Sequence, residues 1–291
     1  MLTGLNIGVF GGDKRYIHIM QKACDEHANI TAVGYETANL QDDRIHSTTL
    51  DKVAFSTLDV ILLPVAGTDS HGKIHSSYTD ETMTLTSELL KSTPSHCSIY
   101  TGTANNTLRQ IADAVNRNLV IFFDRDDIAI ANSIPTAEAT LQIAMEKTKQ
   151  TIHGANVLLT GYGRVGKTIA HLFHQIGANI TVAARKEADI ATIRSLTYNA
   201  VFIHEMRQNL QQADIIINTV PTMLFGQQEL MIIDPDTLII DVASKPGGVD
   251  FTLANDLHIE AIHALGLPGK VAPITAGEIL ADVLISFWKK T

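Results

Sequence analysis

Residues 157–166, which read VLLTGYGRVG, constrain the fold of this chain more than any other segment. A β-prone run leads into glycines at 161, 163 and 166, and the apolar residues that follow have helical spacing: Ile169, Leu172, Phe173 and Ile176. A GxGxxG between a strand and a helix is the context that a dinucleotide fingerprint requires. The first glycine permits the tight turn, the second lets a pyrophosphate approach the backbone, and the third lets the helix pack on the strand. We therefore predict a dinucleotide site at this helix start, the alternative being a glycine-rich turn in an unliganded α/β domain.

The fingerprint assigns six residues to the cofactor: Gly161, Tyr162, Gly163, Arg164, Val165 and Gly166. The next predicted strand, at 180–183, is followed by Ala184, where an NAD enzyme usually has an Asp or Glu for the ribose hydroxyl. Arg185 and Lys186 come next, and a guanidinium can bind a 2′-phosphate through its planar fork. This replacement favours NADP(H) over NAD(H), with Ala184, Arg185 and Lys186 at the adenosine ribose. The alternative is a solvated strand end that carries two cations.

Composition narrows the class of protein. The chain has 291 residues, of which 45% are hydrophobic and 18% charged, so it can bury a substantial core in one or two domains. The formal charge of −9 disfavours nucleic acid and acidic membrane surfaces as partners. Its two cysteines, Cys24 and Cys97, form no CxxC, which fits a reducing compartment. We find no apolar run long enough to span a membrane and no signal peptide, and so expect a cytoplasmic protein.

The strand and helix patterns alternate in two series, which predicts two Rossmann-like, doubly wound parallel-sheet domains with a ligand cleft between them. We expect a first domain over residues 1–134, a bridging helix over 135–150, a nucleotide-binding domain over 151–275, and a C-terminal helix over 276–291 that packs back on the first domain. Ser133 is expected to cap the bridging helix, with Pro135 in its first turn. Residues 82–91 are expected to be helical. We expect no internal repeat.

Two loops of the second series are expected to border the cofactor. Thr219, Val220 and Pro221 follow one predicted strand, and Ala243 and Ser244 follow the next. Open α/β sheets bind ligands at the carboxyl ends of their strands, which is where these loops lie. The second loop should approach the nicotinamide.

Other strand-end residues are candidates for substrate contacts. Residues 11–15, GGDKR, end the first strand, and Arg15 beside helix-start N–H groups suits a carboxylate; the alternative is a structural turn with surface cations. Thr103 lies in a polar strand-end loop, and Lys270 lies in a glycine–proline loop over 265–273. The twelve histidines show no ligand spacing, so we expect no metal site.

Over its whole length the chain resembles the A subunits of bacterial dipicolinate synthases. The segments that carry the resemblance are GGDKR (11–15), YTGT (100–103), NSIPTAE (132–138), GYGRVG (161–166) and LPGKVAPITAG (267–277). GYGRVG is shared with many dehydrogenases, whereas the last run combined with GGDKR is much more specific. The two-domain plan is also similar to formate- and hydroxyacid-type dehydrogenases and to methylenetetrahydrofolate dehydrogenase.

The resemblance implies that an intermediate of the lysine pathway, at the dihydrodipicolinate level, is oxidised with NADP⁺ to dipicolinate during sporulation. It also implies a flavoprotein-like partner, the dipicolinate synthase B subunit, and the mother-cell cytoplasm as location; we expect a homo-oligomer as well. For this dicarboxylate, we expect Arg15 and Lys270 to hold the carboxylates, with Thr103 and Ser133 as hydroxyl donors. Two alternatives stay open: an NADP-binding regulatory or scaffold subunit, and a 2-hydroxyacid-type dehydrogenase.

Overall fold

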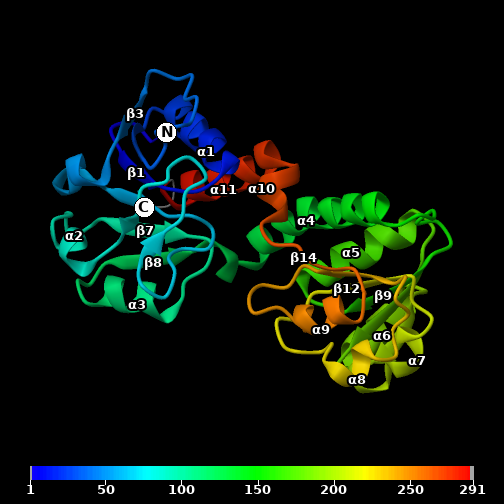
Figure 1. The fold of residues 1–291 in the computed structure, drawn as a ribbon. Helices are drawn as coiled ribbons and strands as arrows, with labels where there is room; N and C mark the ends of the chain where they lie inside the picture. The colour runs from blue at the N-terminus through cyan, green and yellow to red at the C-terminus, as the bar shows by residue number, and fades with distance from the viewer. Residues whose placement is uncertain (1, 289–291) are drawn as a thin grey trace. The chain divides into compact units, whose positions relative to one another are not determined.

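The computed structural model describes residues 2–288 and divides the chain into two compact units. Unit 1 comprises Met1–Ala129 and Ala272–Thr291, and unit 2 comprises Ile130–Val271. Each unit contains a six-stranded sheet whose strand pairs are all parallel (Figure 1). The predicted fold class, two Rossmann-like α/β domains, is therefore confirmed.

The sheet of unit 1 has the order β3-β2-β1-β4-β7-β8. Its strands are β1 (Asn6–Phe10), β2 (Asn29–Val33), β3 (Ile45–Thr48), β4 (Val60–Leu62), β7 (Ser98–Thr101) and β8 (Asn118–Ile121). Its helices are α1 (Lys14–Asp25), α2 (Ser87–Lys91), α3 (Asn106–Asp113) and α11 (Pro273–Trp288). Alternate strand residues enter two cores: α1 and α11 cover one face of the sheet, and α2 and α3 cover the other.

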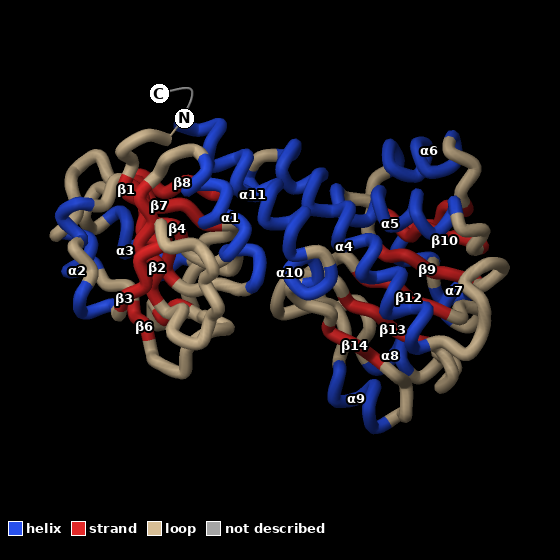
Figure 2. Tube along the Cα trace, turned by 90° about the horizontal axis from the view of Figure 1, so that it is seen from above, coloured by secondary structure: helices blue, strands red, loops and turns tan. Residues whose placement is uncertain are grey.

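The sheet of unit 2 has the order β11-β10-β9-β12-β13-β14. Its strands are β9 (Asn156–Thr160), β10 (Asn179–Ala184), β11 (Asn199–Phe202), β12 (Ile215–Asn218), β13 (Leu238–Asp241) and β14 (Ala261–His263). Its helices are α5 (Arg164–Gln175), α6 (Glu187–Ser195), α7 (Arg207–Leu210), α8 (Gln227–Leu230), α9 (Phe251–Asp256) and α10 (Leu267–Val271), together with most of α4 (Asp126–Lys147). Helices lie on both faces of the strands, as a doubly wound fold requires (Figure 2).

The two units repeat one another, contrary to our expectation of no repeat. Helix α5 begins and ends 150 positions after α1, and the sequence Ala-Asn-Ile-Thr recurs at 28–31 and 178–181. Asp59 Oδ2 accepts the N–H of Asn6 at 2.8 Å, and Asp214 Oδ2 accepts that of Asn156 at 2.7 Å. The repeat is faint in sequence because the side chains of the two cores differ, while the backbone pattern and these strand-start contacts are kept.

Helix α11 packs along α1 within unit 1 (Figure 1). The side chains of Leu280 and Leu284 are buried in the same core as Ile19 and Met20 of α1. A Cβ at Gly277 would lie 2.7 Å from the carbonyl oxygen of Arg15, so only glycine allows this close approach of the helices.

Three sequence-based predictions of local structure are wrong. The bridging helix α4 begins at Asp126 rather than at 135, so that Pro135 lies inside it and Ser133 is not its cap. Residues 82–91 are not one helix, because Met83–Thr84 form β6, which pairs with β5 (Lys73–Ile74) before α2 begins at Ser87. The predicted loop around Lys270 is the short helix α10.

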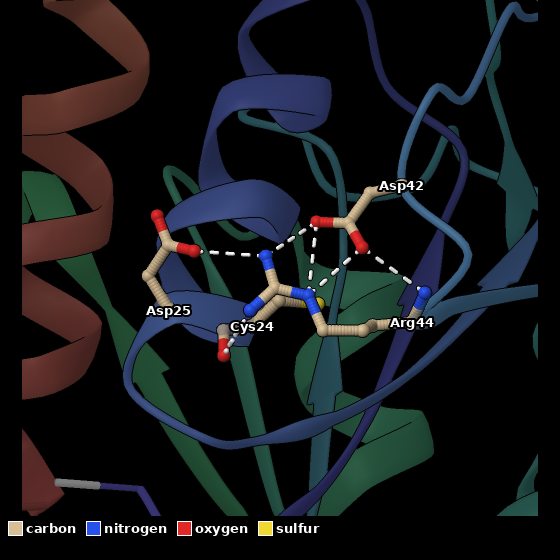
Figure 3. Close-up of polar contacts among 4 residues, drawn as sticks. All are labelled: Cys24, Asp25, Asp42 and Arg44. Atoms are coloured by element: carbon tan, nitrogen blue, oxygen red, sulfur yellow. Dashed lines mark hydrogen bonds and ion pairs between the residues drawn. The ribbon is translucent and has the colours of Figure 1, made fainter.

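A charged cluster joins the end of α1 to the segment that precedes β3 (Figure 3). The Arg44 guanidinium donates to Asp42 Oδ2 at 2.6 Å, to Asp25 Oδ1 at 2.8 Å and to the carbonyl oxygen of Cys24 at 3.1 Å. A cation suits the carbonyl end of a helix, where the backbone dipoles leave partial negative charge. The Arg44 hydrogen bonds lower the pKa of Asp42 to about 2.

Candidate functional site

The fingerprint glycines lie at the turn between β9 and α5, and the geometry of the turn requires glycine at two of them, Gly161 and Gly166. Gly161 has a φ of +93°, and a Cβ there would lie 2.3 Å from Thr219 Oγ1. A Cβ at Gly166 would lie 2.3 Å from the carbonyl oxygen of Gly161. The first glycine therefore makes the turn and the third brings the helix against it, which are the roles that a dinucleotide fold gives them.

The second glycine leaves open space at the helix start. A Cβ at Gly163 would meet no protein atom within 4 Å, and Gly163 is the N-cap of α5. Within the described part of the chain, no side chain caps this helix. Its first N–H groups and the positive end of its dipole are therefore available to an anion, and the room at Gly163 lets a pyrophosphate approach them.

The remaining fingerprint residues support this turn or lie in the first turn of the helix. Tyr162 is buried, and the Lys167 ammonium lies 5.4 Å from the centroid of its ring. Burial raises the pKa of Tyr162. Arg164 and Val165 begin α5, with Arg164 exposed and Val165 half-buried.

The end of β10 presents cations beside this turn. Ala184 is the last residue of β10 and is buried, whereas Arg185 and Lys186 are exposed. Arg185 makes no hydrogen bond or ion pair with any of residues 2–288. Because β10 pairs with β9, these cations extend from the strand next to the phosphate-binding turn, where the adenosine ribose of a dinucleotide lies. The guanidinium is thus free to bind a 2′-phosphate.

The loops after β12 and β13 lie at the same edge of the sheet. Thr219 and Val220 are half-buried and Pro221 is exposed; Ala243 is buried and Ser244 is exposed. Thr219 Oγ1 donates to the carbonyl oxygen of Thr160 at 2.8 Å, which ties this loop to the end of β9.

Sequence reasoning missed a buried polar network beneath these loops. Asn218 Oδ1 accepts from Thr160 Oγ1 at 2.7 Å, and Asn218 Nδ2 donates to Asp241 Oδ1 at 2.9 Å. All three residues are fully buried, on the neighbouring strands β9, β12 and β13. A signal was present in the sequence, since each of these polar residues directly follows an apolar run of its strand. A polar residue at that place also fits the start of a loop, however, so the signal was not specific.

In unit 1, Arg15 is already paired. Its Nε and Nη2 donate to the Asp13 carboxylate at 2.9 and 2.6 Å, and the Arg15 side chain is only 6% exposed. The Asp13 carboxylate also accepts the backbone N–H of Arg15 and so caps α1. The guanidinium is thus already paired with a neighbouring carboxylate, and its expected role in holding a substrate carboxylate stays a prediction.

The other substrate candidates differ in accessibility. Thr103 is exposed, and its hydroxyl donates to the carbonyl oxygen of Val65 at 3.1 Å. Ser133 is fully buried in α4 and its hydroxyl contacts Thr168 Oγ1 at 2.6 Å, so its expected role as a substrate donor has no support. Lys270 is exposed on α10 and makes no hydrogen bond or ion pair with the residues that the structure describes. Of the four candidates, Lys270 is the one with a charged side chain that is exposed and has no partner among the described residues.

Among residues 2–288, no group of three or more His, Cys, Asp or Glu side chains is arranged to hold a metal ion. No helix in this described range has both the length and the apolar character needed to cross a bilayer.

The fold and the turn define a protein with a dehydrogenase-type, dinucleotide-binding α/β domain. Residues 129–267 match the family of D-isomer specific 2-hydroxyacid dehydrogenase NAD binding domains. Residues 6–123 match the N-terminal domain of the dipicolinate synthase A subunit.

Whole-chain relatives identify the family more narrowly. The chain is 43% identical to the dipicolinate synthase A subunit of Bacillus subtilis (strain 168) over 98% of its length and 96% of that protein. The crystal structure of the A subunit from Bacillus halodurans superposes with a TM-score of 0.94 at 41% identity, and the match covers 98% of this chain and 98% of that chain. The crystal structure of the A subunit from Bacillus subtilis superposes with a TM-score of 0.90 at 42% identity, and the match covers 100% of this chain and 97% of that chain. The chain belongs to the family of dipicolinate synthase A subunits.

A more distant likeness shows the fold alone. A transhydrogenase from Sinorhizobium meliloti has a TM-score of 0.68 at 14% identity, with 97% of this chain and 93% of that chain covered.

Proposed function

We propose that this chain is the NADP-dependent dehydrogenase subunit that oxidises a dihydrodipicolinate-level intermediate to dipicolinate. Membership of the family of dipicolinate synthase A subunits supports the product, and the dehydrogenase-type domain supports hydride transfer. The observation that carries the choice of cofactor is Arg185, exposed and unpaired within the described residues, following Ala184 where a ribose-binding acid would exclude a 2′-phosphate.

The residues present fit such a cofactor. Gly163 and the open start of α5 would hold the pyrophosphate, and Arg185 and Lys186 would hold the 2′-phosphate. When bound, the nicotinamide supplies the hydride acceptor. Oxidation to the pyridine removes one hydride and one proton from the substrate, and the aromatic product supplies driving force, so that a water molecule suffices as the base. The part left to the protein is to orient a dicarboxylate, for which Lys270 is the accessible cation.

The relatives are A subunits of their enzyme, which supports a second kind of subunit in the assembly, and we propose that this partner is the flavoprotein-like B subunit. On the same basis we propose that the protein acts in the cytoplasm of the mother cell during sporulation, and that it forms homo-oligomers.

A turnover assay tests the proposal. Purified chain is mixed with freshly generated dihydrodipicolinate and either NADP⁺ or NAD⁺, with and without the B subunit, and reduced nicotinamide is followed by absorbance. We expect reduction with NADP⁺ by the chain alone. If the chain binds NADP⁺ but reduces neither cofactor, with or without the B subunit, the result would instead indicate a regulatory role.

One observation weighs against a 2-hydroxyacid-type mechanism. That mechanism needs a histidine paired with an acid near the nicotinamide. Within the described residues, the hydrogen-bond contact of the His263 ring is with a backbone carbonyl, Nε2 lying 3.1 Å from the Ala243 oxygen, and the ring stacks on Phe251. Lack of turnover with 2-hydroxyacids would agree with this geometry.

A further inference from the structure

The strand order of unit 2 fixes which half of a bound dinucleotide lies over which strands. The phosphate-binding turn joins β9 to α5, and Arg185 follows β10 on one side of β9. Strands β12 and β13 lie on the other side of β9. Because a dinucleotide runs across the carboxyl edge of such a sheet, its adenosine half lies toward β10 and its nicotinamide half toward β12 and β13.

The buried network of Thr160, Asn218 and Asp241 lies beneath that second half. The Asn218 amide is fully used: Nδ2 donates to Asp241 Oδ1 and to the Val220 carbonyl at 2.9 and 3.0 Å, while Oδ1 accepts from Thr160 Oγ1 and the Val220 N–H at 2.7 and 3.0 Å. Each hydrogen-bonding position of this amide therefore has a partner, and two of the four hold the loop after β12.

Asp241 holds the neighbouring loop in the same way. Its Oδ1 accepts the N–H of Ala243 at 2.9 Å, and its Oδ2 accepts the N–H of Gly248 at 2.7 Å. A Cβ at Gly248 would lie 2.4 Å from Asn218 Nδ2, so glycine lets the loop fold back onto the network. A fully buried carboxylate is retained only when hydrogen bonds replace its hydration, and here backbone N–H groups at both ends of this loop supply them.

We propose that Thr160, Asn218 and Asp241 are positioning residues that set the loops 219–221 and 243–248 for the nicotinamide half of the cofactor. None of the three touches solvent. Asn218 and Asp241 bind the backbone of these loops, and Thr160 acts through its hydrogen bond to Asn218. The inference rests on the proposed dinucleotide function and adds the part of the protein that places the reacting ring.

The test separates the two halves of the cofactor. Binding of NADP⁺ and of 2′,5′-ADP, which carries only the adenosine phosphates, is measured by calorimetry for the wild type and for Asp241→Asn. The asparagine keeps the shape but replaces one acceptor oxygen with an amide donor, so that one loop N–H loses its partner. We expect NADP⁺ affinity to fall roughly tenfold to a hundredfold, with 2′,5′-ADP affinity unchanged.

Asp214→Asn is the matched control. Asp214 immediately precedes β12 at the opposite edge of the sheet, and its Oδ2 also accepts a backbone N–H, that of Asn156, at 2.7 Å. We expect Asp214→Asn to leave both affinities unchanged even where it lowers the melting temperature. If Asp241→Asn does not fold, a second pair of variants, Thr160→Val and Thr160→Ser, replaces it. Valine removes the hydroxyl that binds Asn218, whereas serine keeps it. We expect weaker NADP⁺ binding in Thr160→Val only.

The outcomes distinguish this inference from the proposed function. Equal losses of NADP⁺ and 2′,5′-ADP affinity in Asp241→Asn, or in Thr160→Val, would show a general structural role and overturn the positioning role. Wild-type NADP⁺ affinity in both variants would overturn it as well, while leaving NADP⁺ as the cofactor. A wild-type protein that binds neither NADP⁺ nor 2′,5′-ADP would overturn the proposed function and this inference together.

Discussion

The Asp13 carboxylate binds the Arg15 guanidinium through two hydrogen bonds, of 2.9 Å to Nε and 2.6 Å to Nη2, and also caps α1. Gly163, which stands 150 positions later in the repeated unit, has no side chain and leaves the start of α5 open. One copy of the fold thus fills its helix start with an internal carboxylate, and the other keeps it free for a phosphate. We therefore expect no second dinucleotide site at residues 11–15.

We expect Asp13→Ala to destabilise the protein, because it removes the cap of α1 and leaves the buried Arg15 guanidinium unpaired. The lost cap is worth about 1 kcal/mol, and the unpaired group adds about 1–3 kcal/mol. Urea unfolding measures the change. Asp127→Ala is the control, since Asp127 binds Arg125 through the same two guanidinium nitrogens but on the surface, where solvent screens the pair and we expect little change in stability. Similar losses in the two variants would contradict the importance of burial.

Gly163→Val and Gly161→Ala are expected to have opposite effects. At Gly163 a side chain meets no protein atom and φ is −84°, so the variant should fold normally and lose NADP⁺ binding because its side chain occupies the place of the pyrophosphate. At Gly161 a Cβ collides with Thr219 Oγ1 and φ is +93°, so that variant should be destabilised. Thermal melting and calorimetric titration check both. Normal NADP⁺ affinity in Gly163→Val would remove the cofactor from this turn.

We expect Arg185→Ala to weaken NADP⁺ binding by about 1.5–3 kcal/mol, because a charge-assisted hydrogen bond to the 2′-phosphate is lost, and to leave NAD⁺ binding nearly unchanged. Arg194→Ala, which removes an exposed cation from the last turn of α6, is the control. Titration of each variant with both cofactors gives the result. Equal affinity of the wild type for NAD⁺ and NADP⁺ would refute the assignment of this specificity.

The acid side of the stability profile is expected to depend on Asp42. Its folded pKa is about 2, whereas an unfolded aspartate titrates near roughly 4. A carboxylate whose pKa is lower in the folded than in the unfolded protein stabilises the fold at pH values above the unfolded pKa. This stabilisation is lost as the pH falls through the folded pKa. Asp42→Asn should therefore be less stable than the wild type at neutral pH, and the gap should close between about pH 4 and about pH 2. Melting temperatures of the wild type and Asp42→Asn over this pH range test the prediction, and Asp43→Asn, at the exposed neighbouring residue, is the control. A difference in melting temperature that does not depend on pH would exclude the Asp42–Arg44 pair as its cause.

The sequence predicted the dinucleotide-binding unit because its signals are local. The three glycines, the flanking strand and the apolar helix face all lie within about one βαβ unit. The long helix α4 was placed too late because Pro135 is typical of a first helical turn, whereas here it is tolerated inside the helix.

Contacts between distant segments could not be predicted. The register that sets Asn218 beside both Thr160 and Asp241 appears only when three strands are paired, so the buried network was missed. For Arg15 the missing fact was conformational: whether its guanidinium extends outward or folds onto Asp13 depends on the packing around α1 and not on the residue type.

Lys270 is the charged substrate-binding candidate that the structure leaves accessible, and its replacement is the sharpest test of how a dicarboxylate is held. An exposed ammonium without a partner among the described residues is free to pair with a carboxylate. We expect Lys270→Gln to raise the apparent KM for the dihydrodipicolinate-level substrate roughly tenfold to a hundredfold, as loss of one charge-assisted contact predicts, and to leave NADP⁺ affinity unchanged. Lys149→Gln, at an exposed lysine after α4, is the control for a general change of charge in unit 2. Unchanged steady-state kinetics in Lys270→Gln would remove this residue from the substrate site, and a loss confined to NADP⁺ binding would assign it to the cofactor instead.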